Sequence, residues 1–164
     1  MLAPDETISP PLSPQEREAL LGISQGRTTT AETAYDMGVS DSTVKTYILR
    51  VGGKLGTSER AGMVDLAYRD GHLDVPGPVD YVVELPEEQC TVLTALACGN
   101  TVEEIAAGAK RPLDDVRKDA RRLLRALGAS SAAHAVTRGW QLRLLGPATG
   151  RENSGDVVAK AGQA

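Results

Sequence analysis

Aromatic residues are scarce in this sequence of 164 residues, which contains no Phe, one Trp and four Tyr. The cores of β-sandwiches and β-barrels draw heavily on aromatic and β-branched residues, so this composition disfavours a large β core. The apolar residues are mostly Leu, Ala and Val, which is typical of small helices packed against one another. We therefore expect an all-α fold.

Long hydrophobic runs are absent from the sequence as well. No apolar run approaches the ~18–20 residues that a membrane span needs, and the first residues lack the basic and then apolar pattern of a signal peptide. These features favour a cytoplasmic protein. The formal net charge is −4, which weakens the case for avid nonspecific binding to DNA.

Cysteine and histidine are too few to indicate a disulfide or a metal centre. Cys90 and Cys98 are eight residues apart in one expected helix, a rise of ~12 Å, whereas a disulfide needs Cα atoms within ~7 Å. There is no Cys-x-x-Cys pair, and only His72 and His134 could add metal ligands. We expect two reduced core cysteines and neither a metal nor another cofactor.

An internal repeat organises the chain. Residues of the first half recur at an offset of 73 and, after a one-residue slip, at an offset of 72. The recurring residues are apolar positions at helical spacing and glycines at expected helix ends, among them Leu20/Leu93, Gly26/Gly99, Thr28/Thr101, Val44/Val116, Arg50/Arg122, Leu55/Leu127, Gly56/Gly128 and Ala61/Ala133. We interpret this pattern as a duplicated unit of about 60 residues.

The repeat predicts the domain organisation. We expect a disordered tail over residues 1–11, a first unit over 12–73, a linker over 74–84, a second unit over 85–145 and a disordered tail over 146–164. Within the linker, the run Tyr81-Val82-Val83 is expected to pack against a neighbouring element.

Each unit is predicted to contain four short helices. In the first unit, capping residues at Ser13, Thr29 and Ser40 predict the starts of three helices, and a fourth helix is expected from about Ser58 to Asp70. The third helix is expected to end at Gly56 and to fray or bend at residues 52–53, since each Gly costs ~1 kcal/mol relative to Ala in a helix. Such short helices are marginal alone, so each unit must be a compact bundle.

The second and third helices of the first unit are joined by a tight turn at Gly38, which is typical of a helix-turn-helix. The second helix of such a pair enters a DNA major groove, and its N-terminal residues reach base edges. Its buried stripe is predicted to be Val44, Ile48, Val51 and Leu55. The residues left facing outward or sideways carry hydroxyl, phenol and basic groups that suit phosphates and base edges: Thr43, Lys45, Thr46, Tyr47 and Arg50.

The sequence around these residues resembles a known family. The segments LSPQEREALLGISQG and GVSDSTVKTYILRVGGKLGTSERAGMV are similar to the DNA-binding domain of LuxR-type (GerE-like) transcriptional regulators, with the resemblance covering Leu12 to Leu73. It implies a four-helix helix-turn-helix domain of the winged-helix-like superfamily in a bacterial protein, whose third helix reads the major groove and whose fourth often dimerises. It also implies DNA contacts by Thr43, Lys45, Thr46, Tyr47 and Arg50, with Lys54 towards the DNA backbone.

The second unit resembles the family less closely, because Lys110 replaces the turn glycine and Pro112 the capping serine. It is also more basic, with nine basic and seven acidic residues over 85–145, against seven and eight over 12–73. Its third helix carries a basic stripe of Arg117, Lys118, Arg121, Arg122 and Arg125, and we expect Asp114 to pair with Lys118 and Asp119 with Arg122. Three interpretations of this stripe stay open: a solvated, salt-bridged face, a contact to DNA phosphates, and a protein-binding face.

Two classes of function remain. The first is a nucleoid-associated regulator that reads double-stranded DNA through the third helix of the first unit, with the second unit assisting by phosphate contact or dimerisation. The alternative is a protein-interaction module that binds RNA polymerase, a sigma factor or another regulator. An enzyme is not expected, since no nucleophile–base pair or phosphate loop is visible. Two-fold binding could arise from an internal pseudo-dimer or from a homodimer through a fourth helix, over residues 59–70 or 131–144.

Overall fold

The computed structural model describes residues 9–147, and residues 1–8 and 148–164 lie outside the described part. Within that part the chain forms eight helices and no strands, which confirms the all-α prediction. The helices are α1 (Pro14–Ser24), α2 (Thr30–Met37), α3 (Asp41–Leu55), α4 (Arg60–Arg69), α5 (Glu87–Ala97), α6 (Val102–Ala109), α7 (Leu113–Leu127) and α8 (Ala132–Gln141). None of these described helices combines the length and apolar character that crossing a membrane requires.

Helices α1–α4 are referred to below as the first set and α5–α8 as the second. In the first set, α1, α2 and α3 begin where the sequence predicts caps. The Ser13 hydroxyl accepts from the Glu16 N–H at 3.1 Å and the Glu16 carboxylate accepts from the Ser13 N–H at 2.9 Å, which forms a capping box. The side chains of Thr29 and Ser40 cap α2 and α3 in the same way. Helix α4 begins at Arg60, two residues later than predicted.

The second set of helices repeats the lengths of the first in the same order, 11, 8, 15 and 10 residues. Lys110 stands at the position of Gly38, and both residues adopt the left-handed conformation, with φ of 55° and 67°. This conformation costs a residue with a Cβ roughly 1–2 kcal/mol. The turn between the second and third helices therefore recurs even though its glycine does not.

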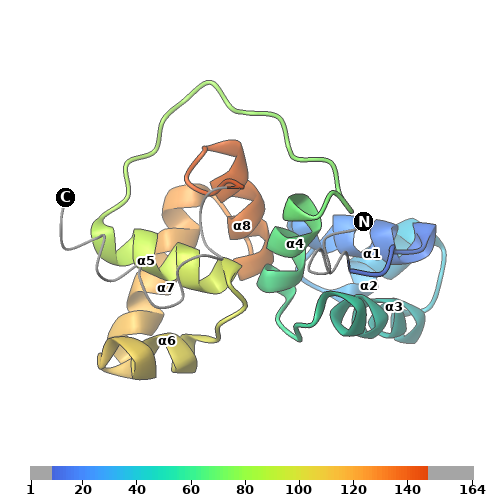
Figure 1. Ribbon diagram of the computed structural model, residues 1–164, viewed down its shortest axis with the longest axis horizontal. Helices are drawn as coiled ribbons and strands as arrows, with labels where there is room; N and C mark the ends of the chain where they lie inside the picture. The colour runs from blue at the N-terminus through green and yellow to red at the C-terminus, as the bar shows by residue number, and fades with distance from the viewer. Residues whose placement is uncertain (1–8, 148–164) are drawn as a thin grey trace, which may run out of the picture.

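Helices α4 and α8 occupy the centre of the molecule, with α1–α3 to one side of them and α5–α7 to the other (Figure 1). Every residue of α4 from Ala61 to Tyr68 is buried. The predicted stripe of α3 is buried too, at Val44, Ile48, Val51 and Leu55. The buried hydrophobic residues of both sets form one continuous cluster, so the two sets share a core.

The chain between α4 and α5 arches over α8 (Figure 1). The Val79 N–H donates to the Gln141 carbonyl at 3.2 Å, and the guanidinium of Arg138 lies 5.8 Å from the centroid of the Tyr81 ring. Val82, by contrast, is 88% exposed. The prediction that the whole run from Tyr81 to Val83 packs against a neighbouring element was therefore wrong at Val82.

The residue ranges predicted to be disordered tails include a few residues that the structure holds in place. The Ser9 hydroxyl donates to Asp70 at 3.1 Å, and the Pro147 carbonyl accepts from Arg69 at 3.0 Å. Residues 9–11 and 146–147 are thus held against folded helices. The tail predictions for residues 1–8 and 148–164 fall outside the described residues.

Cys90 and Cys98 are not joined by a disulfide. Cys90 is half-buried in α5, and burial raises the pKa of its thiol. Cys98 is exposed at the C-terminal end of α5, so the prediction that it is a core residue was wrong. Among the described residues, no group of three or more His, Cys, Asp or Glu is placed to hold a metal ion.

Helix α3 continues through Gly52 and Gly53 to Leu55, which contradicts the expected fraying or bending. A Cβ at Gly52 would lie 2.7 Å from the Thr57 carbonyl oxygen and 2.9 Å from Met63 Cε, whereas a Cβ at Gly53 would meet nothing within 4 Å. A glycine is therefore required at position 52, because the backbone between α3 and α4 passes close to it. A glycine is not required at position 53.

We expect Gly53→Ala to raise the free energy of unfolding by roughly 0.5–1 kcal/mol, because alanine restricts the unfolded chain and favours the helix. Gly52→Ala should lower it, because the backbone at Thr57 must move. Urea denaturation followed by circular dichroism measures both variants. If both substitutions stabilise the protein, the close approach at Gly52 is wrong.

Candidate nucleic-acid interface

Helices α2 and α3 form the helix-turn-helix pair of the first set. Gly38 ends α2 in the left-handed conformation, and Ser40 caps α3 two residues later. The stripe that begins at Val44 holds α3 against the core. The opposite face of α3 is left to solvent, as a helix that enters a groove requires.

The structure places most of the predicted contact residues on that open face. Lys45, Thr46 and Arg50 are exposed, and Thr43 is partly exposed. Arg50 has no ion-pair partner among the described residues. Tyr47 is half-buried and packs against the core, so only part of its side chain is available to a ligand.

Hydroxyl groups gather at the N-terminal end of α3. The Ser40 hydroxyl lies 2.7 Å from the Thr43 hydroxyl and 3.0 Å from the Ser42 hydroxyl. The Thr46 hydroxyl donates to the Ser42 carbonyl at 3.0 Å. These exposed groups can exchange their local hydrogen bonds for contacts to phosphate or base oxygens.

Lys45 is held in place by Asp41, one helical turn earlier, at 2.7 Å. The Lys45 ammonium, followed by the Thr30 hydroxyl, lowers the pKa of the Asp41 carboxyl below its ordinary value. The Lys45 side chain is 63% exposed. Exposed ion pairs of this kind contribute only about 0–1 kcal/mol, so a phosphate can compete with Asp41 for this lysine.

Lys54 is engaged inside the protein rather than presented outward. Its ammonium donates to the Glu16 carboxylate at 2.5 Å and to the Pro11 carbonyl at 3.1 Å. Glu16 is buried, and burial raises the pKa of its carboxyl, but the hydrogen bonds from Lys54 and Ser13 outweigh this effect and leave the pKa below its ordinary value of 4.5. Lys54 thus anchors the C-terminal turn of α3 to α1.

The basic stripe of α7 is exposed along its length, at Arg117, Lys118, Arg121, Arg122 and Arg125. The predicted ion pairs within this helix were wrong. Asp114 lies 3.8 Å from Arg117 instead of pairing with Lys118, and Asp119 is buried and pairs with Arg111 at 2.7 Å instead of with Arg122. In the described part of the chain, only Arg117 among the five basic residues has an ion-pair partner.

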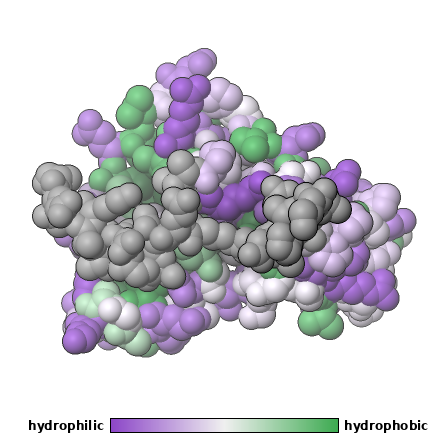
Figure 2. Space-filling model, viewed as in Figure 1, coloured by the Kyte–Doolittle hydropathy of each residue, from purple (hydrophilic) through white to green (hydrophobic). Residues whose placement is uncertain are grey.

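Two residues of the helix-turn-helix that the sequence analysis did not single out are also open to solvent. Tyr35 on α2 is 88% exposed and Leu49 on α3 is 76% exposed. Leu49 lies outside the spacing of the buried stripe, and that is the signal by which the sequence could have identified it. Hydrophilic side chains cover much of both flanks of the molecule, with hydrophobic ones scattered between them (Figure 2).

Residues 10–67 match the family described as bacterial regulatory proteins, luxR family, a segment that spans α1 to α3 and most of α4. Residues 10–67 are a LuxR-family helix-turn-helix domain. Helices α5–α8 lie outside the matched segment.

Two curated relatives match part of the chain. They come from Mycobacterium tuberculosis strains CDC 1551 / Oshkosh and ATCC 25618 / H37Rv, and each is named "Probable transcriptional regulatory protein NarL". Each is 43% identical to this chain over 67 residues, which make up 41% of this chain and 31% of the relative. The chain thus matches about a third of the length of these relatives. No solved structure matches the chain significantly.

We expect Lys54→Met to lower the free energy of unfolding at pH 7 by about 1–3 kcal/mol, because it leaves the buried Glu16 carboxylate without its main partner. The loss should shrink as the pH falls below 4.5, since Glu16 then takes up a proton and no longer needs the ammonium. Urea titrations of wild type and variant at several pH values measure this difference.

Lys45→Met is the matched control, since its ion pair with Asp41 is exposed, and it should change stability little at any pH. Equal losses from the two variants would contradict the structural role of Lys54.

Proposed function

We propose that this protein is a DNA-binding transcriptional regulator that reads a DNA major groove through α3. The observation that carries the proposal is the open face of α3 in a LuxR-family helix-turn-helix domain, where Arg50, Thr46 and Lys45 are exposed. Both curated relatives bear the name of a transcriptional regulatory protein. Such a regulator acts in the cytoplasm, at the nucleoid.

The side chains of α3 divide into base and backbone contacts by their chemistry. Arg50 is the candidate for base recognition, because a guanidinium without a protein partner can donate two parallel hydrogen bonds to a guanine edge. Lys45 is the candidate for a phosphate contact, with Thr43 and Thr46 donating to phosphate or base oxygens nearby. Tyr47 contributes through its exposed part alone. Lys54 is not needed for this role.

We assign the basic stripe of α7 to DNA phosphates. Lys118 and Arg122 occupy the positions that Thr46 and Arg50 occupy in α3, at the repeat offset of 72. Because neither has an ion-pair partner in the described chain, a phosphate contact is favoured over a salt-bridged surface. Asp115 stands where α3 has Thr43, and its carboxylate would repel phosphates and base acceptors at that end, which argues against base reading by α7.

A protein-interaction module is the second candidate function. Tyr35 and Leu49 are exposed on the helix-turn-helix, and exposed large side chains of this kind are common at protein interfaces. The partner in that case is RNA polymerase, a sigma factor or another regulator. The two functions differ in whether the basic residues of α3 are needed for DNA binding.

We expect Arg50→Ala to weaken binding to the preferred DNA sequence by about 10- to 100-fold, because one bidentate base contact contributes about 1–3 kcal/mol. The preferred sequence is first recovered by selecting genomic fragments with the purified protein at ~150 mM salt, near physiological ionic strength. Fluorescence anisotropy then measures the affinity of each variant.

Arg17→Ala removes another exposed charge, on α1, and serves as the control, with little change expected. If selection enriches no sequence, or if Arg50→Ala binds as wild type does, the reading of DNA through α3 is wrong, and the search moves to a protein partner.

The double variant Lys118→Ala, Arg122→Ala should weaken binding to every DNA sequence by a similar factor. It should also reduce the slope of log K against log salt by about 2, since each lost phosphate contact removes about 0.9 from the slope. Affinities measured from 50 to 300 mM KCl test this. An unchanged salt slope would show that α7 does not touch DNA phosphates.

A further inference from the structure

A reciprocal pair of hydrogen bonds joins α4 to α8. The Tyr68 hydroxyl lies 2.9 Å from Thr137 Oγ1, and the Trp140 indole N–H donates to Asp65 at 2.8 Å. At the repeat offset of 72, Tyr68 corresponds to Trp140 and Asp65 corresponds to Thr137. Each fourth helix therefore presents its aromatic residue to the polar residue of the other. The two equivalent aromatic rings also meet, with 5.5 Å between their centroids.

The same exchange recurs at the ends of the first helices. Ser130 precedes α8, and its hydroxyl donates to the carbonyl of Gly26, just after α1, at 2.7 Å. A Cβ on Gly26 would lie 2.8 Å from Nδ1 of His134 on α8. On the other side, a Cβ on Gly62 of α4 would lie 2.8 Å from the Cα of Gly99, at the end of α5.

Gly99 is the repeat equivalent of Gly26, and Gly62 is the repeat equivalent of His134. The end of α1 thus contacts α8 in the same way as the end of α5 contacts α4. Contacts exchanged in this way are the signature of a two-fold symmetric interface.

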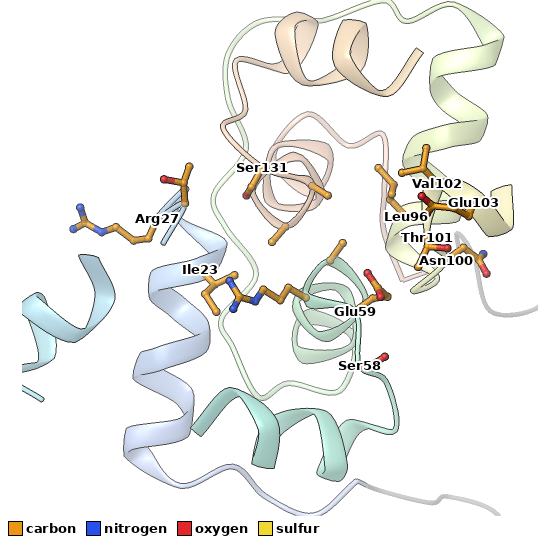
Figure 3. A pocket seen from close by; sticks show the side chains of 15 residues that line it. Ile23, Arg27, Ser58, Glu59, Leu96, Asn100, Thr101, Val102, Glu103 and Ser131 are labelled. Atoms are coloured by element: carbon orange, nitrogen blue, oxygen red, sulfur yellow. The ribbon is translucent and has the colours of Figure 1, made fainter. Parts of the chain in front are cut away.

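A cavity of about 470 Å³ lies between the two sets (Figure 3). The side chains around it come from the end of α1, the start of α4, the corner between α5 and α6, and the start of α8. Its lining includes both members of several repeat pairs, such as Ile23/Leu96, Thr28/Thr101 and Glu59/Ser131. A cavity lined by equivalent residues from both sets lies on the pseudo-two-fold axis.

We propose that one chain is a complete two-fold reader, in which α3 and α7 engage the two halves of a single DNA site without a second copy. This proposal rests on the proposed function. The contact with α8 and the shared core bury Ala61 to Tyr68 of α4, so a second copy would have to displace α8 to pair there. The internal pseudo-dimer therefore takes the place of a homodimer through a fourth helix.

The two halves of the DNA site are read differently, which gives the site a direction. Helix α3 presents Arg50 among hydroxyl groups, whereas α7 presents Arg122 among further cations and has Asp115 near its start. One half is therefore recognised by its bases and the other mainly by its backbone. A homodimer, in contrast, recognises the same sequence twice.

Sedimentation velocity with a duplex recovered by selection tests the stoichiometry. We expect the free protein to be a monomer and the complex to contain one chain per duplex. Specific binding by two chains per duplex would overturn this inference and leave the proposed function standing. Failure to select any sequence would instead overturn the proposed function.

Duplex length is the second arm of the experiment. A duplex shortened so that it ends just beyond the half read by α3 lacks the phosphates that α7 contacts, and it should bind the wild-type protein about 10-fold more weakly. The double variant Lys118→Ala, Arg122→Ala should then bind the original and the shortened duplex equally, because it has already lost the second contact. Arg17→Ala should respond to the shortening as wild type does. A wild-type affinity that is the same for both duplexes would overturn the inference.

Discussion

The packing of α4 against α8 is the contact on which the rest of the structure depends. Asp65 is buried at its centre, where it accepts hydrogen bonds from Arg69 at 2.5 Å and from Trp140 at 2.8 Å. The Arg69 guanidinium in turn lies 5.4 Å from the centroid of the Trp140 ring. A buried carboxylate without such partners is strongly destabilising. Each set of helices therefore completes the other, and the orientation of α3 relative to α7 follows from this one interface.

The two sets share the order of their helices and differ in several polar side chains. Glu16 and Lys54 pair in the first set, whereas Gln89 and Ala126 stand at these positions in the second. The buried side-chain oxygen of Gln89 has no hydrogen-bond partner within the described residues. The second set thus has the same order of helices as the first but lacks the ion pair that joins α1 to α3.

Local patterns in the sequence were enough to predict most of the elements. The caps at Ser13, Thr29 and Ser40 and the stripe from Val44 to Leu55 depend on residues within one or two helical turns, and the structure confirms them. Contacts between elements could not be predicted in the same way. Spacing alone suggested Arg122 as the partner of Asp119, but the fold brings Arg111 to it from the preceding turn. The ion pair between Lys54 and Glu16 was not predicted for the same reason, because the two residues are 38 positions apart in the sequence.

Hydroxyl-radical footprinting of one chain on its selected duplex tests the central claim most directly. The account predicts two protected segments about one helical turn apart on one face of the DNA. Base substitutions should weaken binding in the segment contacted by α3 and have little effect in the other. A single protected segment would contradict the account, and so would two segments that are equally sensitive to base substitution.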